Sequence, residues 1–220
     1  MANNVLKVNG IAIANIAKLN GITDANLVKL NGEEFTGTLP DSHTLIATAT
    51  ASSSATLSFT SGIDGTYDAY EFRFTNMHPA AQPSNFSFQV NAAGASGFNE
   101  TITSTSWRAI LSEGDADAGI GYQAARDQAQ GTAYQVMTAG QGTDADQSAS
   151  GILTLYAPSS TTYVKHFTAR TQFSHQSDYS IQSFTAGYVN VTAAIDEISF
   201  MFDTGNIDAG VIKMYGIATS

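Results

Sequence analysis

Apolar and polar residues alternate along most of the chain beyond residue 43. Tyr70, Phe72 and Phe74 share one parity, and Glu71 and Arg73 share the other. Alternation of this kind, with Gly, Asn, Asp and Ser between the runs, is typical of antiparallel strands that bury one face. The regular spacing of the runs predicts an all-β fold, a jelly-roll-like antiparallel β-sandwich. The main runs cover residues 56–60, 67–76, 86–90, 152–156, 162–173, 179–189, 198–202 and 211–215.

The parity of these runs also predicts which side chains are buried. We expect Phe72 and Phe88 to line the interior between two sheets, with Phe74 and Phe86 beside them. Glu71 and Gln89 have the opposite parity in the same runs and should lie on the surface. Residues 122–130, which are rich in Ala and Gln, are the one candidate for a helix.

The N-terminal segment contains a sequence that is repeated three times at a spacing of 11 residues. The pattern apolar, apolar, Lys, apolar, Asn, Gly begins at Val5, Ile16 and Leu27. Glycine weakens a helix interior, and Asn-Gly tolerates positive φ, so each repeat should be a short extended piece closed by an Asn-Gly turn. Repeats of this size need neighbours to cover their apolar side.

These repeats divide the chain into an N-terminal arm, residues 1–40, and the sandwich, residues 41–220. We expect the arm to serve attachment and oligomerisation, with its apolar side chains buried between subunits or against a partner surface. The alternative is a loosely ordered arm. The expected assembly positions are Val5, Val8, Ile16, Leu19, Leu27 and Leu30.

Composition narrows the range of partners. The net charge is −10, from 9 basic and 19 acidic residues, and no basic run occurs, which argues against nucleic acid as a partner. The absence of cysteine excludes disulfides and thiol chemistry. Only 13% of residues are charged, and a surface of small neutral polar side chains suits particle-bound β proteins. We see no signal peptide and no apolar stretch of about 20 residues, and expect synthesis in a cytoplasm without membrane insertion.

No catalytic motif is present, and the sequence predicts neither an enzyme nor a cofactor. The histidines show no metal-ligand spacing. Two Asp-x-Asp pairs, Asp115 with Asp117 and Asp144 with Asp146, are weak calcium candidates in loops, and a solvated loop is the alternative for each. Some aromatic residues fall near predicted turns, where exposed rings would suit sugar stacking; the alternative is packing in the core or against a subunit. They are Tyr67, Trp107, Tyr122 and Tyr134.

Besides the repeated Lys-x-Asn-Gly motif, four segments are distinctive: residues 70–79, 158–167, 183–188 and 205–217, of which the last is the most characteristic. Together with the motif they resemble structural proteins of tailed bacteriophages, especially marine, cyanophage-type ones. The resemblance implies a virion component, such as a fibre, a tail protein or a head-decoration protein, and it transfers no catalytic residue.

The partners implied are other virion proteins and further copies of the chain. A trimer is expected by analogy with other particle appendages. The alternative is a binding module of a tail fibre that recognises host-surface glycans through the loops of the sandwich.

Overall fold

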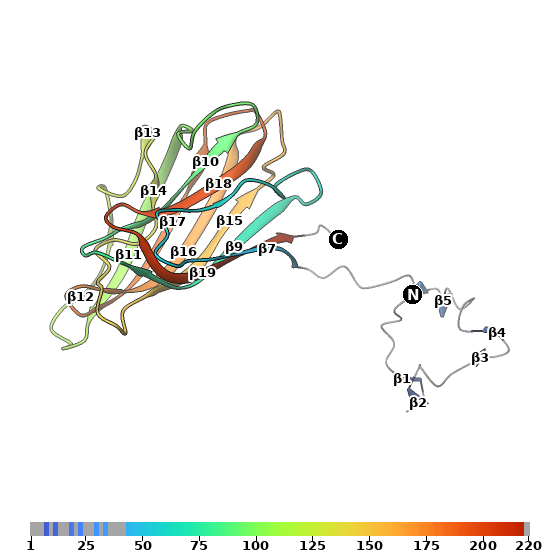
Figure 1. Ribbon diagram of the computed structural model, residues 1–220, viewed down its shortest axis with the longest axis horizontal. Helices are drawn as coiled ribbons and strands as arrows, with labels where there is room; N and C mark the ends of the chain where they lie inside the picture. Colours follow the sequence, from blue (N-terminus) through green and yellow to red (C-terminus); the bar gives the residue numbers. More distant parts are fainter. Residues whose placement is uncertain are drawn as a thin grey trace. The chain divides into compact units, whose positions relative to one another are not determined.

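The computed structural model describes residues 43–217 and six two-residue strands in the preceding segment. The chain divides into two compact units, Met1–Ser42 and His43–Thr219. Strands are the only regular elements in the described residues, and they form two antiparallel sheets packed together in the second unit, confirming the predicted β-sandwich (Figure 1).

Each repeat of the first unit carries one antiparallel pair of two-residue strands. In the first repeat Val8 is paired with Ile11, so only Asn9 and Gly10 separate the paired strands along the chain. The same spacing recurs in the other two repeats, and it is the register of a two-residue β-hairpin, for which Asn-Gly is a preferred connection. The pairs are β1 (Lys7–Val8) with β2 (Ile11–Ala12), β3 (Lys18–Leu19) with β4 (Ile22–Thr23), and β5 (Lys29–Leu30) with β6 (Glu33–Glu34).

The larger sheet of the sandwich has nine strands, with β12 at one edge and β7 at the other. Most strands are long, and β16 and β17 pair over their full eleven residues, from Lys165 opposite Val189 to His175 opposite Tyr179. In order across the sheet the strands are β12 (Ala118–Tyr122), β11 (Ile102–Ser112), β17 (Tyr179–Val189), β16 (Lys165–His175), β15 (Ala149–Tyr156), β9 (Ala69–Pro79), β19 (Ile207–Ile217) and β7 (Thr44–Thr50), and β13 (Ala129–Gly131) also pairs with β11.

The smaller sheet has four strands, and its two central strands pack against the larger sheet through phenylalanine side chains. The rings of Phe86 and Phe74 lie 5.2 Å apart between centroids, and those of Phe88 and Phe167 lie 5.1 Å apart. All four side chains are buried, as is Phe72, so the predicted interior positions are confirmed. The strands in order are β14 (Gln135–Val136), β10 (Phe86–Ala92), β18 (Ile195–Phe202) and β8 (Leu57–Phe59).

The prediction that Gln89 lies on the surface is wrong. Gln89 is fully buried, because the chain that follows β10 and the chain that follows β13 cover the second face of β10. Its Nε2 donates hydrogen bonds to the carbonyl oxygens of Glu100 at 3.0 Å, Thr132 at 3.1 Å and Ala133 at 3.0 Å. Its Oε1 accepts from the Val90 amide at 2.9 Å. Gln89 therefore joins two loops to the smaller sheet.

The predicted helix at residues 122–130 is also wrong. Tyr122 ends β12, and the following turns return the chain to the edge of β11. There the Gln123 amide donates to the carbonyl of Ser106, and the Ser104 amide donates to the carbonyl of Gln128. A nine-residue segment is too short to be a stable helix alone. Pairing with the open strand edge satisfies its backbone groups instead.

Candidate functional site

The candidate calcium ligands do not converge in the structure. Asp115 and Asp117 lie in the turn from β11 to β12, where the Asp117 amide is held by the Ser112 hydroxyl at 3.0 Å. Asp144 and Asp146 lie in a different loop, before β15, where the Asp144 carbonyl accepts a hydrogen bond from the Gln147 amide. Within the described residues no group of three or more His, Asp or Glu side chains could hold a metal ion.

The six assembly positions predicted in the arm lie outside what the structure describes at the side-chain level. Val8, Leu19 and Leu30 belong to the two-residue strands of the three repeats. Val5, Ile16 and Leu27 lie outside the described residues altogether. Their burial therefore stays a prediction.

The outer face of the larger sheet, which points away from the smaller sheet, carries a row of aromatic side chains. Tyr122, Trp107 and Phe184 are direct neighbours on β12, β11 and β17, and Arg170 continues the row on β16. The rings of Trp107 and Phe184 are stacked, with centroids 4.1 Å apart and an interplanar angle of 11°. Trp107 remains 41% exposed, which is unusual for a side chain that large in the middle of a strand.

Some of the aromatic residues that were predicted to lie near turns have other positions in the structure. Trp107 was expected near a turn, but it lies in the middle of β11, five residues after the start of the strand at Ile102. Tyr67 packs against the core. Tyr122 is exposed, so the row of Tyr122, Trp107 and Phe184 supplies aromatic faces on the sheet itself.

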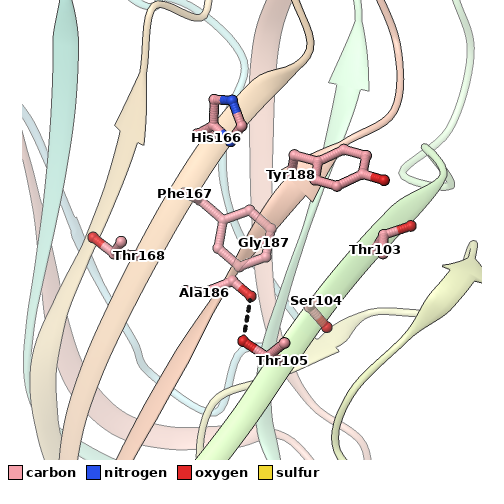
Figure 2. A pocket seen from close by; sticks show the side chains of 9 residues that line it. All are labelled: Thr103, Ser104, Thr105, His166, Phe167, Thr168, Ala186, Gly187 and Tyr188. Carbon is pink, nitrogen blue, oxygen red and sulfur yellow. Dashed lines mark hydrogen bonds between the residues drawn. The ribbon is translucent and has the colours of Figure 1, made fainter.

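Beside the aromatic row lies a hollow of about 380 Å³ on the same face (Figure 2). The rings of His166 and Tyr188 bound it, with centroids 6.1 Å apart and an interplanar angle of 68°. The next row along the strands has only small side chains, Thr105, Ala186 and Thr168, and forms the low part of the hollow. Four residues of strand, about 13 Å, separate the two aromatic rows.

The walls of the hollow offer hydroxyl groups next to the rings. The Thr105 hydroxyl donates to the Ala186 carbonyl at 3.4 Å, and the hydroxyls of Thr168 and Tyr156 lie 3.2 Å apart. Gly187 fits here because a Cβ at that position would lie 2.3 Å from the Thr103 carbonyl oxygen. The hollow thus combines rings and hydroxyls, and none of the described residues that line it is Asp, Glu, Lys or Arg, a combination suited to a neutral polar ligand with an apolar side.

A second concave region lies at one end of the sandwich, on the inner face of the larger sheet. Arg108 of β11, His175 at the end of β16 and Tyr179 at the start of β17 line it, together with Asp117 and Ser177. The His175 Nδ1 accepts a hydrogen bond from the Ser177 amide at 3.1 Å. Burial lowers the pKa of His175 below its usual value, and the nearby charges of Arg108 and Arg126 lower it further.

Sequence patterns missed both regions for different reasons. The sequence contains one signal for the outward position of Trp107, because the small polar residues Ser104 and Ser106 alternate with it. This run lacks the alternation of apolar residues that marks the other strands, so it was not predicted as a strand. Arg108, Arg126 and His175 are far apart in the sequence and have no motif spacing. The pairing of β11 with β17 and of β17 with β16 brings Arg108 and His175 to one end of the sandwich, and the segment after β12, which bonds to β11, brings Arg126 near them.

Comparison with models of known protein families, with curated proteins and with solved structures found no match. In the part of the chain that the structure describes, no helix has the length and apolar character needed to cross a membrane.

Proposed function

We propose that this chain is a non-enzymatic structural component of a bacteriophage virion, a surface-exposed appendage or decoration protein that is anchored through its N-terminal arm. The observation that carries the proposal is the set of three equivalent strand pairs in a unit separate from the sandwich. The resemblance of the repeats and of residues 205–217 to phage structural proteins supports the same function.

The size of the strand pairs supports an anchoring role for the arm. An isolated two-stranded hairpin is marginally stable in water, and pairs of two residues lie well below the usual strand length. Three such pairs with apolar residues at repeated positions gain stability most readily by packing on other virion proteins or on further copies of the chain. The sandwich has its own core and can project from such an anchor as an independent body.

The test places aspartate at the equivalent apolar position of each repeat, as Val8→Asp, Leu19→Asp and Leu30→Asp together. The matched control is Lys7→Gln, Lys18→Gln and Lys29→Gln, which changes the net charge by the same three units in the same repeats. Copies per purified virion, counted by quantitative mass spectrometry, should fall at least about tenfold for the aspartate variant alone. Equal incorporation of both variants would refute anchoring by the apolar positions.

A second candidate function is the binding of a host-surface glycan, and the outer face of the larger sheet favours it. Sugar rings stack on aromatic faces with their apolar side and hydrogen-bond through their hydroxyls. Trp107 stacked on Phe184, the rings of Tyr188 and His166, and the hydroxyls between them offer both kinds of contact. The glycan site proposed in this alternative therefore lies on the sheet rather than in the loops.

The glycan hypothesis can be tested with an array of bacterial surface glycans. Trp107→Ala should weaken any glycan bound by the unaltered chain by about tenfold. Tyr163→Ala is the matched control, because Tyr163 is 73% exposed and lies in the loop between β15 and β16. Binding that survives Trp107→Ala, or is lost equally in both variants, would exclude this face as the site.

A further inference from the structure

The cleft at the end of the sandwich contains a positively charged side chain, that of Arg108, in an acidic protein. The sandwich unit has only six Lys or Arg residues: Arg73, Arg108, Arg126, Lys165, Arg170 and Lys213. Arg108 lines the cleft, and Arg126 lies close enough for the two guanidinium groups to interact. Arg108 therefore lines a concave region, with the charge of Arg126 near it, in a chain whose net charge is −10.

Neither arginine has a direct ionic partner in the described part of the chain, where no carboxylate oxygen lies within 4.0 Å of the Arg108 or Arg126 guanidinium. Arg126 donates instead to the side-chain oxygen of Asn85 at 3.0 Å. Asp203 acts on Arg126 through space, while its own oxygens accept two hydrogen bonds from Asn85, one from the backbone amide at 2.8 Å and one from the side chain at 2.6 Å.

The positive charges repel one another in a partly desolvated setting. Burial lowers the pKa of Arg126 from its usual value, and Arg108 lowers it further, whereas Asp203 raises it. His175 lies within reach of both charges, and its Nδ1 accepts the Ser177 amide, which suits a neutral ring. Like charges held close together without a direct ion pair are destabilising, so an anion that entered the cleft would reduce this repulsion.

We propose that this cleft binds an oxyanion, either a free sulfate or phosphate or the carboxylate of an acidic sugar, with Arg108 as its principal ligand. The guanidinium fork suits two-point contact with such groups. Ser177 lines the same cleft, and its hydroxyl can donate a further hydrogen bond. The volume of the cleft, about 320 Å³, is enough for a small anion or one acidic sugar unit.

Asp117 allows a further test, in which a substitution should strengthen anion binding. It lines the cleft, and its Oδ2 accepts a hydrogen bond from the Tyr179 hydroxyl at 3.4 Å. A carboxylate in this position repels an incoming anion. Asp117→Asn keeps the side-chain shape and an acceptor oxygen while removing the charge, so it should tighten anion binding.

The experiment titrates the full chain with sodium sulfate, sodium phosphate and sodium glucuronate at constant ionic strength, following heat release and the melting temperature. Saturable binding of at least one anion is expected, and glucuronate binding tighter than sulfate or phosphate would identify the sugar-acid source. Arg108→Gln should weaken binding by about tenfold or more, the loss expected for one charge-assisted contact. Lys213→Gln, which removes the same charge from an exposed position on β19, should leave the affinity unchanged.

Two results would overturn the proposal. One is the absence of saturable binding for all three anions; the other is equal weakening by Arg108→Gln and Lys213→Gln, which would show a general charge effect. If Arg108→Gln does not fold, Arg108→Lys retains the charge but loses the fork, and unchanged affinity for all three anions in that variant would equally refute Arg108 as a two-point ligand. None of these measurements depends on incorporation into a particle, so the proposed anion site and the proposed virion function can each be refuted without the other.

Discussion

Gln89 should be among the polar residues of the sandwich whose replacement destabilises the fold most. It is fully buried on β10, and its amide group joins the smaller sheet to the backbone at Glu100, Thr132 and Ala133. The side chain contributes two N–H donors shared among three carbonyls and one acceptor used by the Val90 amide. Gln89→Ala removes all of these hydrogen bonds at once.

The magnitude follows from the number of groups left without a partner. Three hydrogen bonds at about 1–1.5 kcal/mol each give an expected loss of about 3–5 kcal/mol in the free energy of unfolding. Gln89→Met fills nearly the same volume without the hydrogen bonds, and it should lose about 3 kcal/mol, which separates the polar contribution from the cavity. Gln172→Ala is the control, because Gln172 is exposed on β16 and bonds only the Ser180 hydroxyl; it should cost about 0.5 kcal/mol.

Equilibrium unfolding in urea, followed by circular dichroism and tryptophan fluorescence, measures these differences as shifts of the midpoint at constant slope. A loss below about 1 kcal/mol for Gln89→Ala would show that water reaches the freed carbonyls. A Gln89→Met variant as stable as the unaltered chain would show that volume alone matters at this position. Either result would refute the role of Gln89 as a link between the loops and the smaller sheet.

Two further predictions concern the core and the end cleft. Phe88→Ala should lower the free energy of unfolding by about 3–5 kcal/mol, whereas Thr168→Ala on the outer face should cost about 0.5 kcal/mol; similar losses in thermal melts would contradict the assigned faces. The pKa of His175 in the folded state lies below the unfolded value of 6.5. Between these two pKa values the unfolded chain binds more protons than the folded chain, so the free energy of unfolding falls as the pH drops through that window. Urea midpoints measured at intervals from pH 7 downward should fall less steeply for His175→Gln, and identical slopes would refute the assignment.

The period of the sequence determined the sandwich and much of its core. Side chains of successive strand residues point to opposite faces, so the alternation at Phe72 and Phe88 already defined their common side without any knowledge of the partner strands. The Asn-Gly spacing of the arm likewise predicted three short turns, and the strand pairs at Val8–Ile11 and its equivalents have the matching register. These are local properties of backbone geometry, and local sequence is enough to specify them.

The tertiary structure alone decided what covers each strand face. The parity of Gln89 correctly placed it away from the phenylalanine layer, but loops from distant segments cover that second face and bury it. Residues 122–130 do not form a helix for a similar reason, because their backbone groups hydrogen-bond to the open edge of β11 instead. Arg108, Arg126 and His175 come close together because of the order and register of the strands. Strand order and register are set by backbone hydrogen bonds between segments far apart in the sequence, so they cannot be predicted from the spacing of these residues along the chain.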